Sequence, residues 1–338
     1  MPAIRDFVQR LPKAELHVHL EGSMPPGLLL ELARKRRVSL PADDEAGLRR
    51  WFVFQDFPHF LEIYLTCSRC LRDPEDFQAL LESFVEQQAA QNIVYSEVHF
   101  TISTHLTNGA NGDEVADALW QSIAAAERRG IVVRLIPDIV RNIEPTAADR
   151  TLEWALDNRS RGVVALGLAG MEGPSLAPFR EHFTVARGEG LHTTAHAGEQ
   201  RGAEAIHEVL EVCRPERIGH GIRAIDDAEL VAKLAATGLP LEVCPTSNVC
   251  LGYAASVAEH PFDSLRQAGV ALTINSDDPP LFGTSLIDEF CALEKAFGYS
   301  HHELAGFART AFEHAFLDAA ERKGYLERFD QELALLNS

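Results

Sequence analysis

The stretch Ala14-Glu15-Leu16-His17-Val18-His19-Leu20 carries the pattern that decides the fold. It is a short, largely apolar run in which two histidines stand at alternate positions. Residues two apart in a β-strand point to the same face, so His17 and His19 are predicted to face one interior together. Seven further short apolar runs follow along the chain, at residues 93–101, 132–139, 162–168, 191–196, 217–220, 239–244 and 270–275.

Longer amphipathic stretches separate most of these runs. They cover residues 113–129, 146–158, 178–189, 202–213, 226–237 and 260–268. Such alternation predicts parallel strands joined by helical crossovers, because parallel neighbours need a covering element between them. Eight units of this kind favour an α/β protein with a (β/α)8 TIM barrel. An open parallel sheet is the alternative, since periodicity alone does not show that the sheet closes.

The spacing is uneven after the first run, where about 70 residues separate Leu20 from Ile93, far more than an ordinary crossover. Helices are predicted within this insertion over residues 55–71 and 74–91, and two more at the C-terminal end over 303–316 and 318–335. We expect one domain over residues 1–338, with the insertion at about 21–92. An aromatic group in the insertion forms either core or a lid over a pocket: Phe52, Phe54, Phe57, Phe60 and Tyr64.

Composition narrows the class of partner. The 338 residues carry a formal net charge of −19, which repels nucleic acid and anionic membranes and favours a small-molecule partner. No apolar stretch approaches a membrane span, and the N-terminal residues show no secretory signal pattern. The six cysteines are scattered, as expected for reduced thiols in a cytoplasmic protein. Cys67 and Cys70 are predicted to pack within a helix.

Polar residues stand where several predicted strands end. His196 ends the fifth strand, His220 ends the sixth and Asp277 follows the eighth; the Cys244-Pro245 turn with Ser247 and Asn248 is a weaker member of the set. The carboxyl ends of barrel strands meet on one face, and buried imidazoles and carboxylates need partners or a metal ion. Together with His17 and His19, these residues predict a metal site.

Imidazole and carboxylate ligands suit zinc, with iron or manganese as alternatives, and we expect no cysteine to compete. A two-metal site on this scaffold would use a lysine after the fourth strand, where the chain has Gly167-Leu168-Ala169-Gly170. One metal ion per chain is therefore predicted.

Three residues beside the expected ligands are candidates for acid–base chemistry. Glu199 either transfers a proton to a heteroaromatic nitrogen or caps the following helix. His220, between Gly219 and Gly221, is expected to orient the attacking hydroxide or act as a base. Asp278 either hydrogen-bonds a substrate ring nitrogen or caps a helix beginning near Pro279.

These motifs together resemble the adenosine/adenine deaminase family. The resemblance covers roughly residues 9–320 and rests on residues 13–22 (KAELHVHLEG), 196–199 (HAGE), 219–221 (GHG), 242–245 (EVCP) and 275–279 (NSDDP). The family is a zinc-dependent (β/α)8 barrel of the amidohydrolase superfamily. It hydrolyses the exocyclic amine of 6-aminopurines to a 6-oxo group and ammonia, so the resemblance implies that activity here.

Carried over by motif, the resemblance implies roles for individual residues. The zinc ligands would be His17, His19, His196 and Asp277. Glu199 would protonate the purine N1, while His220 with Asp277 would take the proton from the attacking water. The substrate would be contacted by His19, Glu21, Gly170 and Asp278, with Asp278 at N7, the Gly170 N–H at N3 and Glu21 near the ribose 5′ end.

Departures from the family pattern leave the substrate open. Glu21 resembles adenine deaminases, whereas Leu168-Ala169-Gly170 and Gly219-His220-Gly221 resemble nucleoside deaminases; Gly167 replaces an aspartate usual in the latter. We favour adenosine or deoxyadenosine. The alternatives are adenine, a 5′-modified adenosine such as 6-aminodeoxyfutalosine of menaquinone synthesis, and a catalytically inactive purine-binding relative. An inactive relative usually loses a ligand or the proton-transferring glutamate, and this chain keeps all of them.

Overall fold

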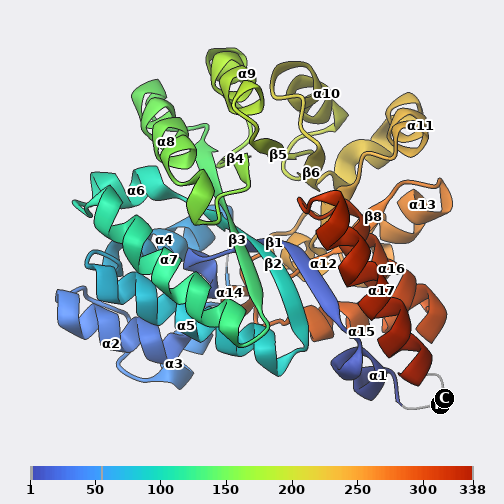
Figure 1. The fold of residues 1–338 in the computed structure, drawn as a ribbon, viewed down its shortest axis with the longest axis horizontal. Helices are drawn as coiled ribbons and strands as arrows, with labels where there is room; N and C mark the ends of the chain where they lie inside the picture. Colours follow the sequence, from blue (N-terminus) through green and yellow to red (C-terminus); the bar gives the residue numbers. More distant parts are fainter. Residues whose placement is uncertain (1–2, 55, 337–338) are drawn as a thin grey trace.

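Eight parallel strands form the centre of the molecule in the computed structural model, which describes residues 3–54 and 56–336. Neighbours in the sheet are neighbours in the chain, from β1 to β8, and helices surround them (Figure 1). The strands are β1 (Lys13–His19), β2 (Ile93–Phe100), β3 (Val132–Val140), β4 (Ala165–Ala169), β5 (His192–Ala197), β6 (Arg217–His220), β7 (Leu241–Val243) and β8 (Leu272–Ile274).

The sheet closes between its first and last strands through the segment that follows β8. The backbone N–H of His19 donates to the Asp277 carbonyl at 2.9 Å, and the Asp277 N–H donates to the His17 carbonyl at 3.2 Å. The side-chain oxygen of Asn275 accepts the backbone N–H groups of Leu16 and His17 at 3.0 and 3.1 Å. The predicted barrel is thereby confirmed and the open sheet is wrong.

The helices lie outside the barrel and at its two ends. Their bounds are α1 (Ile4–Arg10), α2 (Pro26–Arg36), α3 (Glu45–Trp51), α4 (Phe57–Cys70), α5 (Pro74–Ala90), α6 (Ile102–Thr107), α7 (Gly112–Arg128), α8 (Pro145–Asp157), α9 (Arg180–Gly188), α10 (Ala203–Val212), α11 (Ala228–Thr237), α12 (Pro245–Cys250), α13 (Phe262–Gln267), α14 (Pro279–Phe282), α15 (Leu286–Phe297), α16 (His301–His314) and α17 (Ala319–Leu336). Among the described residues, no helix has both the length and the apolar character needed to cross a membrane.

The insertion after β1 folds into helices, as predicted, but into more of them. α4 and α5 match the two expected helices, apart from Gln55, which lies outside the described residues. α2 and α3 were not expected; Asp44 caps α3 by accepting the backbone N–H of Gly47 at 2.6 Å. Cys67 and Cys70 are buried on α4, so their predicted packing role is confirmed.

The aromatic residues of the insertion divide between the two predicted roles. Phe52 is buried in the core, and Phe54 packs edge-to-face on Phe282 of α14 with ring centroids 5.3 Å apart. Phe57, Phe60 and Tyr64 on α4 instead line a cavity at the carboxyl end of the barrel. The insertion thus supplies both core and one wall of a pocket.

Candidate active site

The four predicted metal ligands come together at the carboxyl ends of β1, β5 and β8. His19 Nε2 lies 3.2 Å from His196 Nε2 and 3.3 Å from Asp277 Oδ1, and His17 Nε2 lies 3.6 Å from the same Asp277 oxygen. Tetrahedral zinc with bonds of about 2.0–2.1 Å places its ligand atoms roughly 3.3 Å apart. The set therefore fits one divalent cation.

The outer nitrogens and the charges around this cluster support the same conclusion. His17 Nδ1 lies 2.8 Å from Glu242 Oε2, and His196 Nδ1 lies 2.8 Å from the Leu168 carbonyl oxygen, which leaves Nε2 of each ring to face the cluster. Although burial lowers the pKa of His17, Asp277 and Glu242 together raise it to about 10. Without a cation the cluster binds protons, and a divalent cation would displace them.

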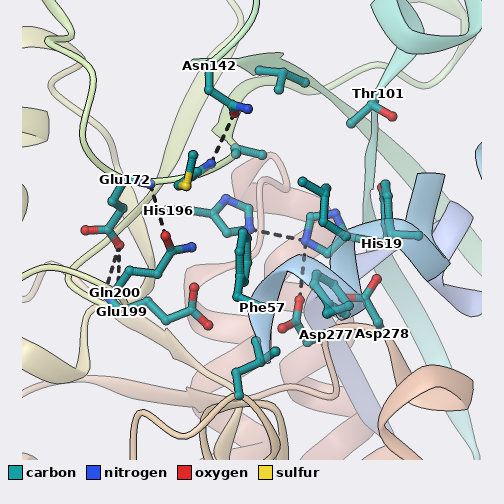
Figure 2. A pocket seen from close by; sticks show the side chains of 18 of the residues that line it. His19, Phe57, Thr101, Asn142, Glu172, His196, Glu199, Gln200, Asp277 and Asp278 are labelled. Carbon is teal, nitrogen blue, oxygen red and sulfur yellow. Dashed lines mark hydrogen bonds and ion pairs between the residues drawn. The ribbon is translucent and has the colours of Figure 1, made fainter. Parts of the chain in front are cut away.

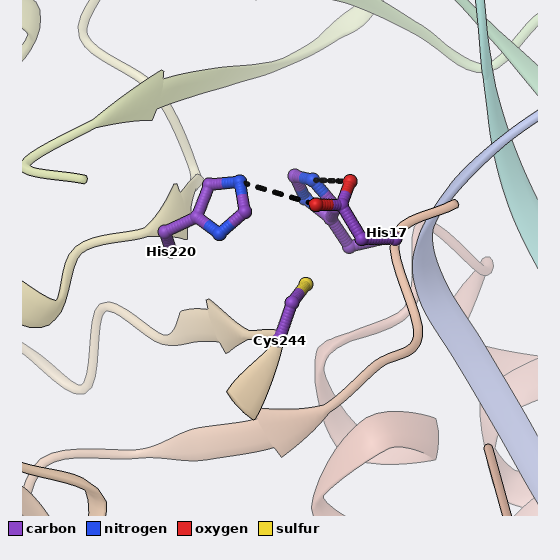
Figure 3. A group of neighbouring side chains, drawn as sticks. His17, His220 and Cys244 are labelled. Atoms are coloured by element: carbon purple, nitrogen blue, oxygen red, sulfur yellow. Dashed lines mark ion pairs between the residues drawn. The ribbon is translucent and has the colours of Figure 1, made fainter. Parts of the chain in front are cut away.

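Cys244 corrects one expectation from the sequence. A ligand atom from each of Cys244, His17, His220 and Asp277 lies within 4.8 Å of those of the other three (Figure 3), so a cysteine does lie beside the metal ligands. Its thiol is oriented toward the Glu242 carbonyl oxygen at 3.7 Å, and burial raises the pKa of Cys244 well above its usual value. In this environment Cys244 is a neutral thiol rather than a competing thiolate.

Glu199 and His220 are joined by an amide. The Asn248 side-chain nitrogen lies 3.3 Å from Glu199 Oε1 and 3.3 Å from His220 Nδ1, so the predicted Asn248 motif does reach the site. Burial, followed by the negative charge of Asp277, raises the pKa of Glu199 well above its usual value. Burial lowers the pKa of His220 to about 3. Burial therefore favours the uncharged form of each group, the carboxylic acid of Glu199 and the neutral imidazole of His220.

Asp277 and Asp278 face different partners. Asp277 accepts a hydrogen bond from the Ser247 hydroxyl at 2.6 Å, and despite burial its pKa is held well below the usual value by His17 and His19. Asp278 lines the cavity, and within the described residues its Oδ1 has no hydrogen-bond partner. Burial and the adjacent Asp277 raise the pKa of Asp278, so it can donate a hydrogen bond into the cavity. Gly22 leaves room for it, because a Cβ there would lie 1.5 Å from Asp278 Oδ1.

Two of these residues adopt strained backbone conformations. His220 has φ of 59° and Asp277 has φ of 64°, in the left-handed region that side chains other than glycine adopt only at a cost. Strain of this kind persists where the surrounding structure imposes it, and it is concentrated at functional sites. His220 is the last residue of β6 and Asp277 is the third residue after β8, so the sharp turns at the ends of these strands carry both side chains into the cluster.

Sequence reasoning missed Glu172, which holds the loop that carries Glu199. One Glu172 oxygen accepts the backbone N–H groups of Glu199 at 2.9 Å and Gln200 at 3.3 Å. The other accepts those of Gly198 at 3.3 Å and Arg201 at 3.2 Å. The only sequence indication was an acid soon after the fourth strand, on the face where barrel active sites lie.

A cavity joins these groups to the surface (Figure 2). Polar side chains line its inner end, and Figure 2 labels His19, Glu199, Asp277 and Asp278 among them. Its outer part is largely apolar and combines α4 with the segments after β3, β4 and β7: Phe57, Phe60, Leu61, Tyr64, Leu65, Val140, Ile143, Met171 and Leu251. Among the described lining residues there is no lysine or arginine. Gly170 is in the lining, as its predicted substrate contact requires.

Glu21 contacts Thr101, a residue of the cavity lining. Its side chain is fully buried, and its Oε1 accepts the Thr101 backbone N–H at 2.9 Å and the Thr101 hydroxyl at 2.5 Å, with His105 Nε2 at 2.9 Å. It is not among the residues that line the cavity. Its Oε2 has no hydrogen-bond partner among the described residues, so the predicted contact of Glu21 with the substrate stays a prediction.

Comparison with known proteins gives the class of this fold and site. The family model described as adenosine deaminase matches residues 12–332. The chain is 39% identical to an aminodeoxyfutalosine deaminase of Streptomyces coelicolor, covering 96% of this chain and 85% of the relative. It is 40% identical to an adenine deaminase of Rhizobium rhizogenes, covering 95% and 100%.

Solved structures of related proteins have a similar fold. An adenine deaminase from Arthrobacter aurescens superposes with a TM-score of 0.91 at 31% identity, covering 96% of this chain and 99% of that one. A Burkholderia ambifaria amidohydrolase with bound zinc gives 0.89 at 25% identity, covering 100% and 96%. The chain belongs to the adenosine deaminase family. It is a hydrolase that acts on the C–N bonds of cyclic amidines.

Proposed function

We propose that the protein hydrolytically deaminates a 6-aminopurine nucleoside, with adenosine and deoxyadenosine as the simplest substrates. The observation that carries the proposal is the inner end of the cavity, where Glu199, His220 and the Oδ1 of Asp278, unpaired among the described residues, adjoin the His–Asp cluster, and where burial favours the uncharged forms of Glu199 and His220. An acid, a base and a hydrogen-bond donor around one cavity are what addition of water to an amino-substituted heteroaromatic ring requires.

We assign the acid–base roles from these protonation states. Glu199 donates its proton to the purine N1, which makes C6 electrophilic. His220 accepts the proton of the attacking water, and Asp278 donates a hydrogen bond to N7. The backbone N–H of Gly170, on the opposite side of the cavity lining, contacts N3. The proton that His220 took from the water passes to the amino group at C6, the C6–N bond breaks and ammonia leaves. The C6 hydroxyl returns a proton to Glu199, which gives the 6-oxo product with N1–H and restores both side chains.

We assign one zinc ion per chain to His17, His19, His196 and Asp277. The bound cation would supply Lewis acidity that makes water a nucleophile near neutral pH. The candidate ligand groups overlap, since each contains His17 or His19, and this favours one centre. Gly167-Leu168-Ala169-Gly170 offers no side chain to bridge a second ion.

The outer cavity favours a substrate larger than the free base. Adenine would occupy the polar inner end and leave the apolar wall of α4 without a partner. Leu65, Ile143 and Met171 at this wall are 37%, 39% and 45% exposed, as expected for side chains that contact a ligand. We infer that residues 1–338 act as one domain and that α4 covers the ribose end of the substrate.

A second candidate is an adenosine with an uncharged, apolar 5′ substituent. The apolar outer wall and the absence of described cationic lining residues favour such a group over a phosphate. One relative is an aminodeoxyfutalosine deaminase, which supports a 5′-modified nucleoside as a substrate class but not the absence of charge on the substituent. Sequence identity does not choose between the substrates, because adenine deaminases are equally similar.

Ammonia release tests these proposals. We would compare kcat/KM for adenine, adenosine, deoxyadenosine, 5′-phenylthio-5′-deoxyadenosine and AMP, since this ratio measures differential transition-state binding. Adenosine is expected to exceed adenine and AMP by at least about tenfold. A preference for the 5′-phenylthio compound would select the second candidate. A preference for adenine or AMP would refute the nucleoside proposal, and no release from any purine would refute the chemistry.

A further inference from the structure

The three histidines of the metal cluster differ in what supports their outer nitrogens. A metal-binding histidine nearly always donates its second ring N–H to an acceptor, which fixes the orientation of the ring. His17 and His196 have such acceptors in Glu242 and the Leu168 carbonyl. His19 Nδ1 is buried and has no hydrogen-bond partner in the described part of the chain. One ligand ring therefore lacks the usual support.

His99, on β2, offers the complementary atom. Its Nδ1 lies 2.9 and 3.1 Å from the two carboxylate oxygens of Asp138 on β3. We assign the ring proton to Nδ1, with Asp138 as its acceptor, which leaves a free lone pair on Nε2. That Nε2 is buried and, among the described residues, has no partner either. The His99 and His19 rings have centroids 5.0 Å apart, and the two residues are paired in the register of β1 and β2. Neighbouring rings thus each have one buried nitrogen without a partner among the residues that the structure describes, and no hydrogen bond joins the two nitrogens in this structure.

Gly167 explains how Asp138 fits beside the cluster. Asp138 and Gly167 are register partners on β3 and β4. A Cβ at position 167 would lie 1.9 Å from Asp138 Oδ1 and 3.0 Å from Ile136 Cγ2. The carboxylate of Asp138 therefore occupies the volume that a side chain at position 167 would fill. Position 167 lacks the aspartate that is usual in nucleoside deaminases. The carboxylate of Asp138, on the neighbouring strand β3, lies where that side chain would be.

We propose that His99 and Asp138 act in series as positioning residues for His19: Asp138 holds the His99 ring, and His99 Nε2 accepts the Nδ1–H of His19. The inference rests on the metal site of the proposed function. Neither residue lines the cavity, so neither is expected to contact substrate. Their predicted effect is on cation affinity and ligand-ring geometry.

The test measures zinc affinity by chelator competition and the visible spectrum of the cobalt-substituted protein. His99→Leu and Asp138→Asn are expected to weaken zinc binding by about 10–100-fold, the usual effect of losing a partner of a ligand, and to shift the cobalt bands. His99→Gln retains a side-chain acceptor and should lose less affinity than His99→Leu. Trp154→Phe, which removes the donor to the Gly112 carbonyl on the outer layer, is the control and should leave zinc affinity unchanged.

A double variant that moves the carboxylate from position 138 to position 167 tests whether the two positions share one volume. Gly167→Asp combined with Asp138→Gly should bind zinc more tightly than Asp138→Gly alone, because both positions reach one volume. Wild-type affinity and spectra in His99→Leu and Asp138→Asn, even with a lowered melting temperature, would overturn the proposal. Failure of the relocated carboxylate to raise affinity would overturn the shared-volume step. If the wild-type protein itself binds no zinc, the metal assignment fails instead.

Discussion

The Glu172 carboxylate provides a sharp test of how the loop carrying Glu199 is held. It accepts four backbone N–H groups, two on each oxygen, from residues 198–201. Glu172→Gln keeps the shape but leaves one oxygen, and its NH2 group then faces two donors. Because the amide can retain the 2.9 Å bond to Glu199 N–H, the pair most readily lost is the longer one, from Gly198 and Arg201.

The size of the effect follows from those bonds. Hydrogen bonds to charged groups contribute about 1.5–3 kcal/mol each, and the two lost bonds are 3.3 and 3.2 Å long. Taking the lower value for each gives about 3 kcal/mol. If the loss of these bonds makes the catalytic position of the loop less favourable by about 3 kcal/mol, kcat/KM falls roughly 100-fold. The zinc content should not change, because Glu172 does not contact the predicted ligands.

The assay is steady-state ammonia release from the best substrate, with zinc content measured on the same preparation. Glu303→Gln is the matched control: Glu303 accepts one backbone N–H, from Ser300 at 2.9 Å, at the start of α16 and away from the cavity lining, and a glutamine oxygen can retain this bond. A Glu172→Gln enzyme within about threefold of wild type would refute the estimate, which requires a loss near 100-fold. An equal loss in the Glu303 variant would show that the effect does not come from the Glu199 loop.

Three further predictions concern the acid, the cation and a buried carboxyl. Glu199→Gln should retain zinc and lose about 10²–10⁴ of kcat, as expected for a missing general acid; a wild-type turnover rate would contradict the N1 role. Elemental analysis should find one zinc per chain, with activity lost to a chelator and restored by zinc, whereas a reproducible two would overturn the single-ion site. Glu289 is fully buried against Thr246 and Thr284, and burial raises its pKa from 4.5 to about 7. A raised pKa means that its stabilisation is complete below about pH 4.5 and is lost as the pH rises through 7, by about 3 kcal/mol. Urea unfolding of wild type and Glu289→Gln from about pH 5 to 8 should show this fall in wild type only, and parallel curves would contradict it.

Much of the site could be predicted because barrel geometry converts position in the chain into position in space. His196, His220 and Asp277 each stand where an apolar run ends, and parallel order brings all such ends to one face. The alternation of His17 and His19 likewise predicts a shared direction. These inferences need only local pattern, and the structure places all five residues together.

The residues that were missed depend on packing between strands. Asp138 can lie beside His99 only because its register partner, Gly167, has no side chain, and no local pattern reveals a register. The turn at Cys244 was a weaker member of the predicted set, and its closeness to His17 and Asp277 could not be predicted because it depends on how β7 packs across the barrel. Glu172 acts through backbone N–H groups, which every residue has, so its partners leave no trace in the sequence.

The role that the resemblance implies for Glu21 differs from the contacts of its Oε1 in the structure. The resemblance implied that this acid reads the far end of the substrate. Oε1 of Glu21 instead accepts two hydrogen bonds from Thr101 and lies 2.9 Å from His105 Nε2, and although burial raises the pKa of Glu21, these partners lower it to about 2. Turning it toward a ligand would leave those buried donors unpaired, at about 1–3 kcal/mol each. Discrimination at the ribose end is therefore expected to come from the apolar residues of α4, because they are the groups that face the cavity there.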